Sequence, residues 1–195
     1  MKPQTTTAMS NSKTEVTQLL NQLDVASNRE KLYPLVYDNL HVIANKIFSN
    51  ERNNHTLQPT LLVNEAYMNL VDQENLSWNS RTHFYVVGAK AIRRILVHHA
   101  RTKNAQKRGG GMVNVSLDEG LTVAENQEEA ILDIHEGLEK LAEVSPRQAQ
   151  VVEMKFFGGL KMQEIAEELN VSIKTIEVDW KVAKAWLRKF MKTEV

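Results

Sequence analysis

Residues 162–190 read MQEIAEELNVSIKTIEVDWKVAKAWLRKF, and this stretch decides the fold of the C-terminal part of the chain. Its apolar residues recur every three to four positions, which predicts a short helix over 162–169 and a longer one over about 172–191. Asn170-Val171 forms the tight turn between them. The inner stripe of the second helix is Ile176, Trp180, Ala183 and Leu187. Two helices joined in this way predict a helix-turn-helix, whose second helix can enter the major groove of DNA.

The outer face of that second helix carries short polar and basic side chains. The candidate DNA contacts on it are Lys174, Thr175, Glu177, Val178, Lys181 and Lys184. We expect Lys174, Thr175 and Glu177 to lie near base edges and the two later lysines to lie nearer to phosphates. The same pattern also fits a plain three-helix bundle with a solvated outer face.

Helical periodicity also covers most of the chain ahead of this unit, and no strand is compelling. Pro34 takes an early helix position, Pro59 and Thr60 open a second helix, and a third spans about 82–103. An acidic helix is expected over about 128–141. The sequence therefore predicts an all-α fold.

Ser145-Pro146-Arg147-Gln148 predicts the start of a further helix that ends at Gly158-Gly159. Ser would cap it, Pro fits the first helical position, and Gln three residues after Ser would complete a capping box. The whole pattern predicts two helical domains joined by an acidic linker. The expected bounds are a disordered N-terminus over 1–13, a first domain over 14–108, a flexible linker over 109–127 and a second domain over 128–195.

The charges sum to zero, with 24 Lys and Arg against 24 Asp and Glu, but they are not evenly spread. Residues 88–111 contain seven basic residues and no acid, whereas residues 112–144 contain nine acids and one lysine. A basic block attracts polyanions, and nucleic acid is the obvious polyanion inside a cell. Both blocks could instead be solvated faces.

The third predicted helix has an apolar stripe that includes Phe84, which we expect to lie in the core. Its outer face carries the candidate DNA contacts Lys90, Arg93, Arg94, Arg101 and Lys103. Just ahead of it, Asn79, Ser80 and Arg81 follow Trp78 in a polar and aromatic loop. Such a loop beside a basic helix suits a single-stranded or locally melted nucleic acid, because it can accept an unstacked base.

Several classes of protein are excluded or disfavoured. The chain has no cysteine, and His98-His99 point about 100° apart on a helix, so we expect no metal site. Neither a Gly-rich phosphate loop nor a Ser-His-Asp pattern is present, so we expect no cofactor, no catalytic residue and no enzyme. The polar N-terminus and the lack of an apolar run of about 20 residues indicate a cytoplasmic protein without membrane contact.

Three stretches carry a resemblance to a known family. Residues 80–84, 91–101 and 107–111, which read SRTHF, AIRRILVHHAR and KRGGG, resemble region 2 of extracytoplasmic-function (ECF) sigma factors. LQPTLLVNEAY, at 57–67, resembles the segment that precedes it, and residues 145–148 with the helix-turn-helix resemble region 4. The resemblance spans about residues 15–190.

The resemblance implies a bacterial sigma factor that binds core RNA polymerase, through its beta-prime clamp helices and beta flap, and promoter DNA. The first domain would melt and read the minus-ten element, with Arg93, Arg94 and Arg101 on its DNA and Asn79, Ser80 and Arg81 near a flipped base. The second would read the minus-thirty-five element. The implied polymerase-docking residues are Thr60, Leu61, Asn64, Glu65 and Met68.

One departure from the family matters. Its members usually carry several carboxylates at the start of the polymerase-docking helix, but residues 55–62 contain none and Glu65 is the first. A phosphate on Thr60, or less favourably on Thr56, would add about −1.5 to −2 charge, which the helix dipole favours in a first turn. We therefore hypothesise a Ser/Thr kinase that activates the protein. Thr60 could equally be a simple helix cap.

Two other classes of protein stay open on the residues alone. The chain could be a stand-alone helix-turn-helix regulator that never joins polymerase. It could also be a helical adaptor whose basic helix binds a protein or RNA. Co-purification with core polymerase separates the sigma factor from both.

Overall fold

The computed structural model describes residues 15–22, 26–48, 58–72, 80–106, 115–116, 122–123 and 127–193. Residues 15–20 are helical. The longer helices are α2 (Ala26–Phe48), α3 (Pro59–Val71), α4 (Arg81–Gln106), α5 (Gln127–Val144), α6 (Pro146–Phe156), α7 (Met162–Glu168) and α8 (Ile173–Thr193). The all-α prediction is confirmed. Residues 1–13, most of 109–127, and Thr56, Trp78 and Asn79 lie outside the described residues, and the domain bounds stay predictions.

Two short strands lie within the segment expected to be a linker, where the sequence showed no strand. β1 (Val115–Ser116) pairs antiparallel with β2 (Thr122–Val123), with Val115 opposite Val123. Each strand has two residues, so their pairing does not change the fold class. Within the described ranges, no helix is long and apolar enough to cross a bilayer.

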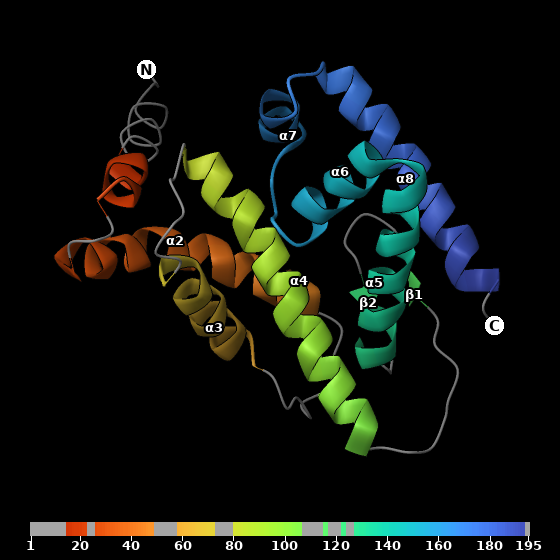
Figure 1. Ribbon diagram of the computed structural model, residues 1–195, viewed down its shortest axis with the longest axis horizontal. Helices are drawn as coiled ribbons and strands as arrows, with labels where there is room; N and C mark the ends of the chain where they lie inside the picture. Colours follow the sequence, from red (N-terminus) through yellow and green to blue (C-terminus); the bar gives the residue numbers. More distant parts are fainter. Residues whose placement is uncertain are drawn as a thin grey trace, which may run out of the picture.

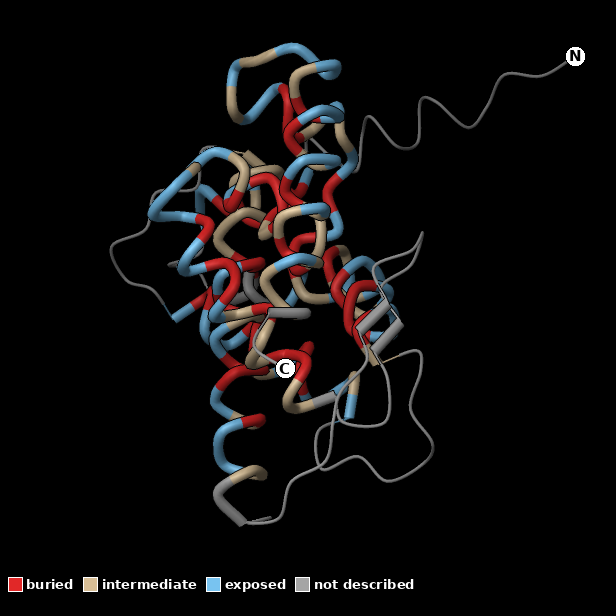
Figure 2. Tube along the Cα trace, turned by 90° about the vertical axis from the view of Figure 1, so that its right-hand side faces the viewer, coloured by how far each residue is buried: buried red, intermediate tan, exposed pale blue. Residues whose placement is uncertain are grey.

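Helix α4 occupies the centre of the molecule, with α2 and α3 on one side and α5 to α8 on the other (Figure 1). It can take this place because it is apolar on more than one face. Phe84, Ala89, Ile92 and Leu96 are all at most 2% exposed. Phe84 is therefore a core residue, as the sequence predicted. Buried positions lie on the facing sides of the helices, while their outer sides stay exposed (Figure 2). One contiguous hydrophobic cluster thus includes residues from both predicted domains.

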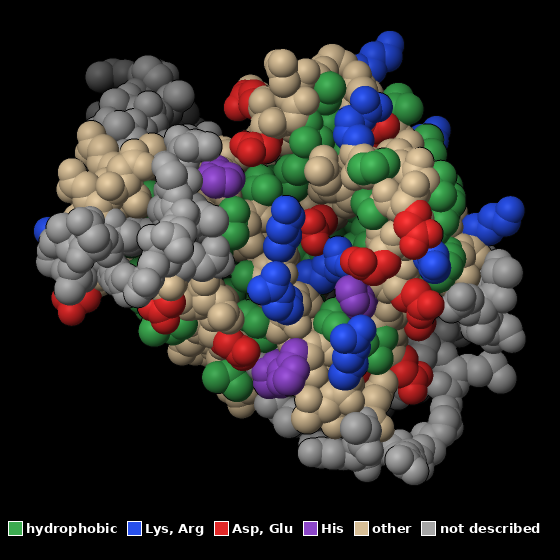
Figure 3. All heavy atoms as spheres, in the orientation of Figure 1, with side chains coloured by type: hydrophobic (Ala, Val, Ile, Leu, Met, Phe, Trp, Pro, Cys, Tyr) green, Lys and Arg blue, Asp and Glu red, His purple; other side chains and the backbone are tan. Residues whose placement is uncertain are grey.

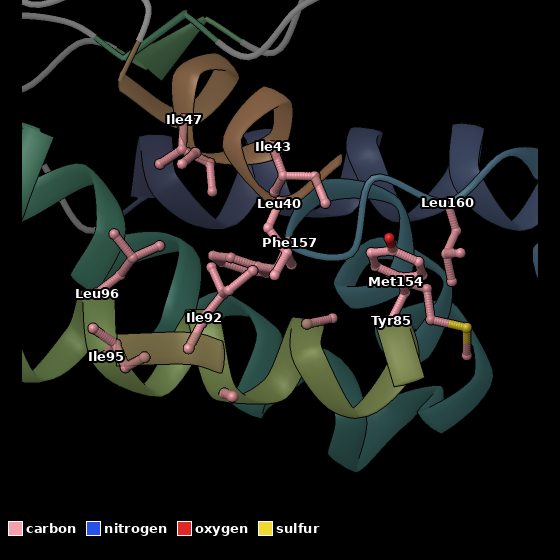
Figure 4. Packing of buried hydrophobic residues seen from close by; sticks show 14 of the residues in the cluster. Leu40, Ile43, Ile47, Tyr85, Ile92, Ile95, Leu96, Met154, Phe157 and Leu160 are labelled. Atoms are coloured by element: carbon pink, nitrogen blue, oxygen red, sulfur yellow. The ribbon is translucent and has the colours of Figure 1, made fainter. Parts of the chain in front are cut away.

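The two halves meet mainly where α4 packs against α5, and the end of α6 adds a second contact. Phe157 is fully buried and lies among Leu40 of α2 and Ile92 of α4 (Figure 4). The next two residues are glycines for a steric reason. A Cβ on Gly158 would stand 3.2 Å from the Cβ of Ala89, and one on Gly159, whose φ is +62°, would stand 2.6 Å from Ile43. The loop after α6 therefore packs directly on α4 and α2.

Two sequence expectations about helix starts are wrong. Pro34 does not open a helix but lies inside α2, which begins at Ala26. A proline inside a helix removes one backbone hydrogen bond of that helix. Two contacts stabilise the part of α2 ahead of Pro34: Leu32 is fully buried, and the Asn28 side-chain amide donates to the carbonyl of Gln22 at 2.9 Å. The other error concerns the start of α6.

Ser145 is the N-cap of α6, with Pro146 next, but its side chain makes no capping hydrogen bond. The expected capping box does not form because α5 runs directly into α6. The backbone N–H of Ser145, which the Gln148 side chain would have accepted, already donates to the carbonyl of Leu141 at 2.7 Å.

Candidate nucleic-acid interface

Helices α7 and α8 form the helix-turn-helix, and the turn has clear local causes. Asn170 adopts φ +52°, a left-handed conformation that Asn tolerates better than most residues. Ser172 then caps α8, because its hydroxyl oxygen accepts a hydrogen bond from the backbone N–H of Thr175 at 3.1 Å. The predicted inner stripe of α8 faces the core, where Ile176 and Ala183 are fully buried.

An ion pair that the sequence analysis missed holds α8 on α6. Arg147 donates to the Asp179 carboxylate from Nε at 2.6 Å and from a terminal nitrogen at 3.3 Å. The Asp179 side chain is only 5% exposed. The sequence position of Asp179 could have revealed the ion pair, since Asp179 falls between Ile176 and Trp180 on the inner face of the helix. An acid at such a position usually has a basic partner.

The candidate DNA contacts of α8 fall into two groups. Lys174, Glu177, Val178 and Lys181 are exposed on the outer face, with Val178 54% exposed. The other two have local partners: the Thr175 hydroxyl lies 2.8 Å from that of Ser172, and the Lys184 ammonium lies over the ring of Trp180, 5.3 Å from its centroid. The exposed group is free to meet a groove.

The basic face of α4 borders a pocket of about 480 Å³ between α4 and the α5–α6 corner. It is lined by Lys90, Arg93, Arg94, Val97, His98, Arg101, His135, Glu139 and Glu153. Basic and acidic side chains alternate along this junction (Figure 3). Lys90, Arg94 and Arg101 are exposed, so three of the candidate DNA contacts of α4 reach solvent.

Arg93 is the exception, with a side chain only 14% exposed. Its guanidinium donates to Glu153 of α6 at 2.9 Å, to Glu139 of α5, and to Nδ1 of His135 at 2.7 Å. Because Nδ1 accepts, His135 is the neutral tautomer in this arrangement. Each of the three guanidinium nitrogens of Arg93 therefore already faces a partner from the second half of the chain.

The pKa of His135 is lower than that of an ordinary histidine. Burial is the main cause, and the positive charge of Arg93 adds to it. The charged groups facing the ring are Arg93 and Arg101 from α4 and Glu136 and Glu139 from α5, and the two carboxylates act in the opposite direction. Protonation of His135 at low pH therefore destabilises this cluster of charged side chains.

The remaining candidates of the first half are also partly occupied. Ser80 caps α4, since its hydroxyl accepts the backbone N–H of His83 at 3.0 Å. Arg81 lies over the ring of Tyr85 and 3.5 Å from a Glu164 oxygen of α7. Lys103 forms an ion pair with Glu128 at the start of α5.

Helix α3, which holds the candidate docking residues on its outer face, packs mainly against α2 and α4. Leu61 and Met68 are 48% and 54% exposed. Asn64 accepts a hydrogen bond from the Tyr33 hydroxyl at 2.5 Å, and Glu65 lies 3.3 Å from His99. Thr60 is exposed. This face of α3, with apolar and polar side chains, is thus accessible.

Among the described residues, no group of three His, Asp or Glu side chains could hold a metal ion. The described residues thus form a helical protein with two separate candidate contacts to nucleic acid, one on α4 and one on α8.

The family model for the ECF sigma factor matches residues 13–193. The chain therefore belongs to the ECF sigma factor family, as the resemblance in its sequence indicated. Family membership supports a role as an RNA polymerase sigma factor, a transcription factor rather than an enzyme, with core polymerase and promoter DNA as partners. No curated protein matches the chain.

Proposed function

We propose that this protein directs promoter recognition at two DNA elements. The first half, through α4 and the loop ahead of it, binds the melted minus-ten element, and the outer face of α8 reads the minus-thirty-five duplex. The observation that carries the proposal is the exposed outer face of α8. Lys174, Val178 and Lys181 project from a helix whose opposite face is buried and clamped by Arg147 to Asp179. A rigidly held helix with short polar and basic groups outward suits a major groove.

Run-off transcription with purified core polymerase and a genomic promoter library tests this proposal. Transcripts that appear only when the chain is added support it. Lys181→Ala should weaken binding to all promoters and reduce its salt dependence, because a phosphate contact is lost. Lys174→Ala should instead change which promoters are used. No transcripts and no polymerase binding would contradict the proposal and favour a stand-alone regulator.

We further propose that phosphorylation of Thr60 completes the polymerase-docking surface on α3. The first turn of α3 contains no acid. Thr60 is exposed and is not the cap of the helix, since the N-cap position belongs to Gln58, whose side chain makes no capping bond. A phosphate there would lie beside the free backbone N–H groups of the first turn and would supply the charge that a basic partner surface attracts. A Ser/Thr kinase would then be a partner of the chain.

The affinity of the full chain for core polymerase tests the switch. Thr60→Glu should bind several-fold more tightly than wild type, because an added carboxylate at a helix N-terminus imitates part of the phosphate charge. Gln150→Glu adds the same charge at an exposed position of α6 and is the matched control. Equal affinities of Thr60→Glu and Gln150→Glu, together with no phosphate on Thr60 in the protein from its native cell, would exclude the switch.

A further inference from the structure

We propose that the pocket between α4 and the α5–α6 corner is a binding site for a short chain of phosphate groups, such as that of a nucleoside triphosphate or of inorganic tripolyphosphate. The volume of the pocket, about 480 Å³, lies within the range of about 300–1,000 Å³ that is usual for small-molecule sites. The inference goes beyond the proposed function, because it concerns a small ligand of the chain and not promoter DNA.

One wall of the pocket is a row of basic side chains on α4. Lys90, Arg94, His98 and Arg101 all line the pocket and are all exposed. They follow one another at intervals of three or four residues, which places them on one face of the helix. The row extends over about 16 Å of the helix axis, at about 1.5 Å per residue, so a single phosphate cannot reach both of its ends. A chain of phosphates can contact several members of the row at once.

The positive charges of this row are not neutralised by the protein. The two glutamates that line the pocket both pair with Arg93. Lys90, Arg94 and Arg101 form no ion pair within the part of the chain that the structure describes. Like charges four residues apart on a helix, as at Lys90 and Arg94, repel each other and destabilise it. A bound anion would remove this repulsion, and a guanidinium group can hold two phosphate oxygens at once.

The opposite wall makes the site a pocket rather than a flat basic surface. Glu139 and His135 of α5 and Glu153 of α6 face α4 across it, and Nδ1 of His135 lies 2.7 Å from a guanidinium nitrogen of Arg93. Of the nine lining residues only Val97 is apolar, whereas four are Lys or Arg and two are Glu. Basic side chains gather along this junction (Figure 3). The lining therefore favours a small, polar ligand of negative charge.

A bound polyphosphate would also affect DNA binding. Lys90, Arg94 and Arg101 are candidate DNA contacts, so the ligand and the promoter would compete for the same side chains. This consequence rests on the proposed function of α4, whereas the existence of the site does not.

Isothermal titration calorimetry of the full chain tests the site at an ionic strength of about 0.15 M, which screens weak surface attraction. The probes are orthophosphate, tripolyphosphate and ATP, each without divalent cations. We expect one tripolyphosphate per chain, bound at least about tenfold more tightly than orthophosphate, because linked phosphates bind several cations together. A higher affinity for ATP than for tripolyphosphate would identify a nucleotide as the ligand, and equal affinities would show that the phosphate chain alone is recognised. Both results support the site.

Two charge-matched double variants test the row on α4. Lys90→Gln with Arg94→Gln should weaken tripolyphosphate binding at least about tenfold, because two charge-assisted contacts are lost. Lys31→Gln with Lys161→Gln removes two exposed charges outside the pocket and is the control, which should bind as wild type does.

A second pair of variants tests the opposite wall. Glu139→Gln should strengthen tripolyphosphate binding about threefold, because a carboxylate that repels the ligand is removed. Glu143→Gln removes an exposed acid of the same helix outside the pocket and should have no effect. Equal losses in the two double variants, or equal affinities for orthophosphate and tripolyphosphate, would overturn the site, since binding would then reflect the general charge of the chain. Absence of run-off transcription with the binding results intact would overturn the sigma role and leave the site standing.

Discussion

Replacing Phe157 with alanine is the most direct perturbation of the contact between the two halves. The ring is 0% exposed, and its neighbours Leu40 and Ile92 are 1% and 2% exposed. Removing a buried Phe side chain costs about 3–5 kcal/mol, with the higher values where the surroundings cannot collapse into the cavity. Neighbours held in two different helices, α2 and α4, have little freedom to collapse. We expect a loss of about 4 kcal/mol, a large part of a typical stability of about 5–15 kcal/mol.

Urea denaturation measures this loss with two signals. Circular dichroism follows all helices, while tryptophan fluorescence mainly follows α8, which carries Trp180 and Trp186 of the three tryptophans. The wild-type transitions should coincide, because the halves share one core. With a slope of about 2 kcal/mol per molar urea, Phe157→Ala should lower the midpoint by about 2 M and separate the two transitions.

Phe156→Ala is the matched control. Phe156 is half-buried, and its ring centroid lies 4.5 Å from that of Phe157. Its removal should cost less than half as much, because less apolar area is lost. If the two variants had equal stability, or if the wild-type transitions did not coincide, the reasoning from the shared core would be refuted.

Two further predictions concern stability. Gly88→Ala should stabilise α4 by about 0.5–1 kcal/mol, because its new Cβ would lie 3.5 Å from Leu70, which is an ordinary contact. Gly137→Ala should instead lower the stability of the protein, since its Cβ would lie 2.8 Å from a side chain of α8. Thermal denaturation measures both effects, and a Gly137→Ala variant more stable than wild type would contradict the packing. His135 has a lowered pKa in the folded chain, so its contribution to stability is present above about pH 6.5 and is lost as pH falls through that lowered pKa. The urea midpoint of wild type should therefore fall more between about pH 7.5 and 5.5 than that of His135→Gln, and parallel curves would contradict the prediction.

Elements with strong local signals could be predicted from the sequence. Pro59 marked the start of α3, and the Asn170 turn separated α7 from α8 within a residue or two of their observed bounds. In these places the signal is a backbone property of the residue itself. Pro34 gave a wrong helix start, because proline usually lies in the first turn of a helix, whereas α2 begins eight residues earlier, at Ala26. The burial of Leu32 in that early part is a tertiary contact, which the residues around Pro34 do not reveal.

The candidate site was predictable in its residue types but not in its partners. The basic block and the acidic block were visible as adjacent runs of opposite charge. Nothing local specified that Arg93 would meet Glu153, 60 positions later, or that Arg147 would bind Asp179, 32 positions later. These pairings depend on how the helices pack in three dimensions.

The shielding of Arg93 also bears on where idle copies of the protein reside in a cell. A chromosome offers about 10⁶–10⁹ non-specific sites, and an uncovered basic helix would be held by them through phosphate contacts alone. A copy whose Arg93 is already paired with Glu139 and Glu153 makes fewer such phosphate contacts, although Lys90, Arg94 and Arg101 stay exposed. A smaller share of the copies is then held on non-specific DNA, and a larger share is available for recruitment by polymerase.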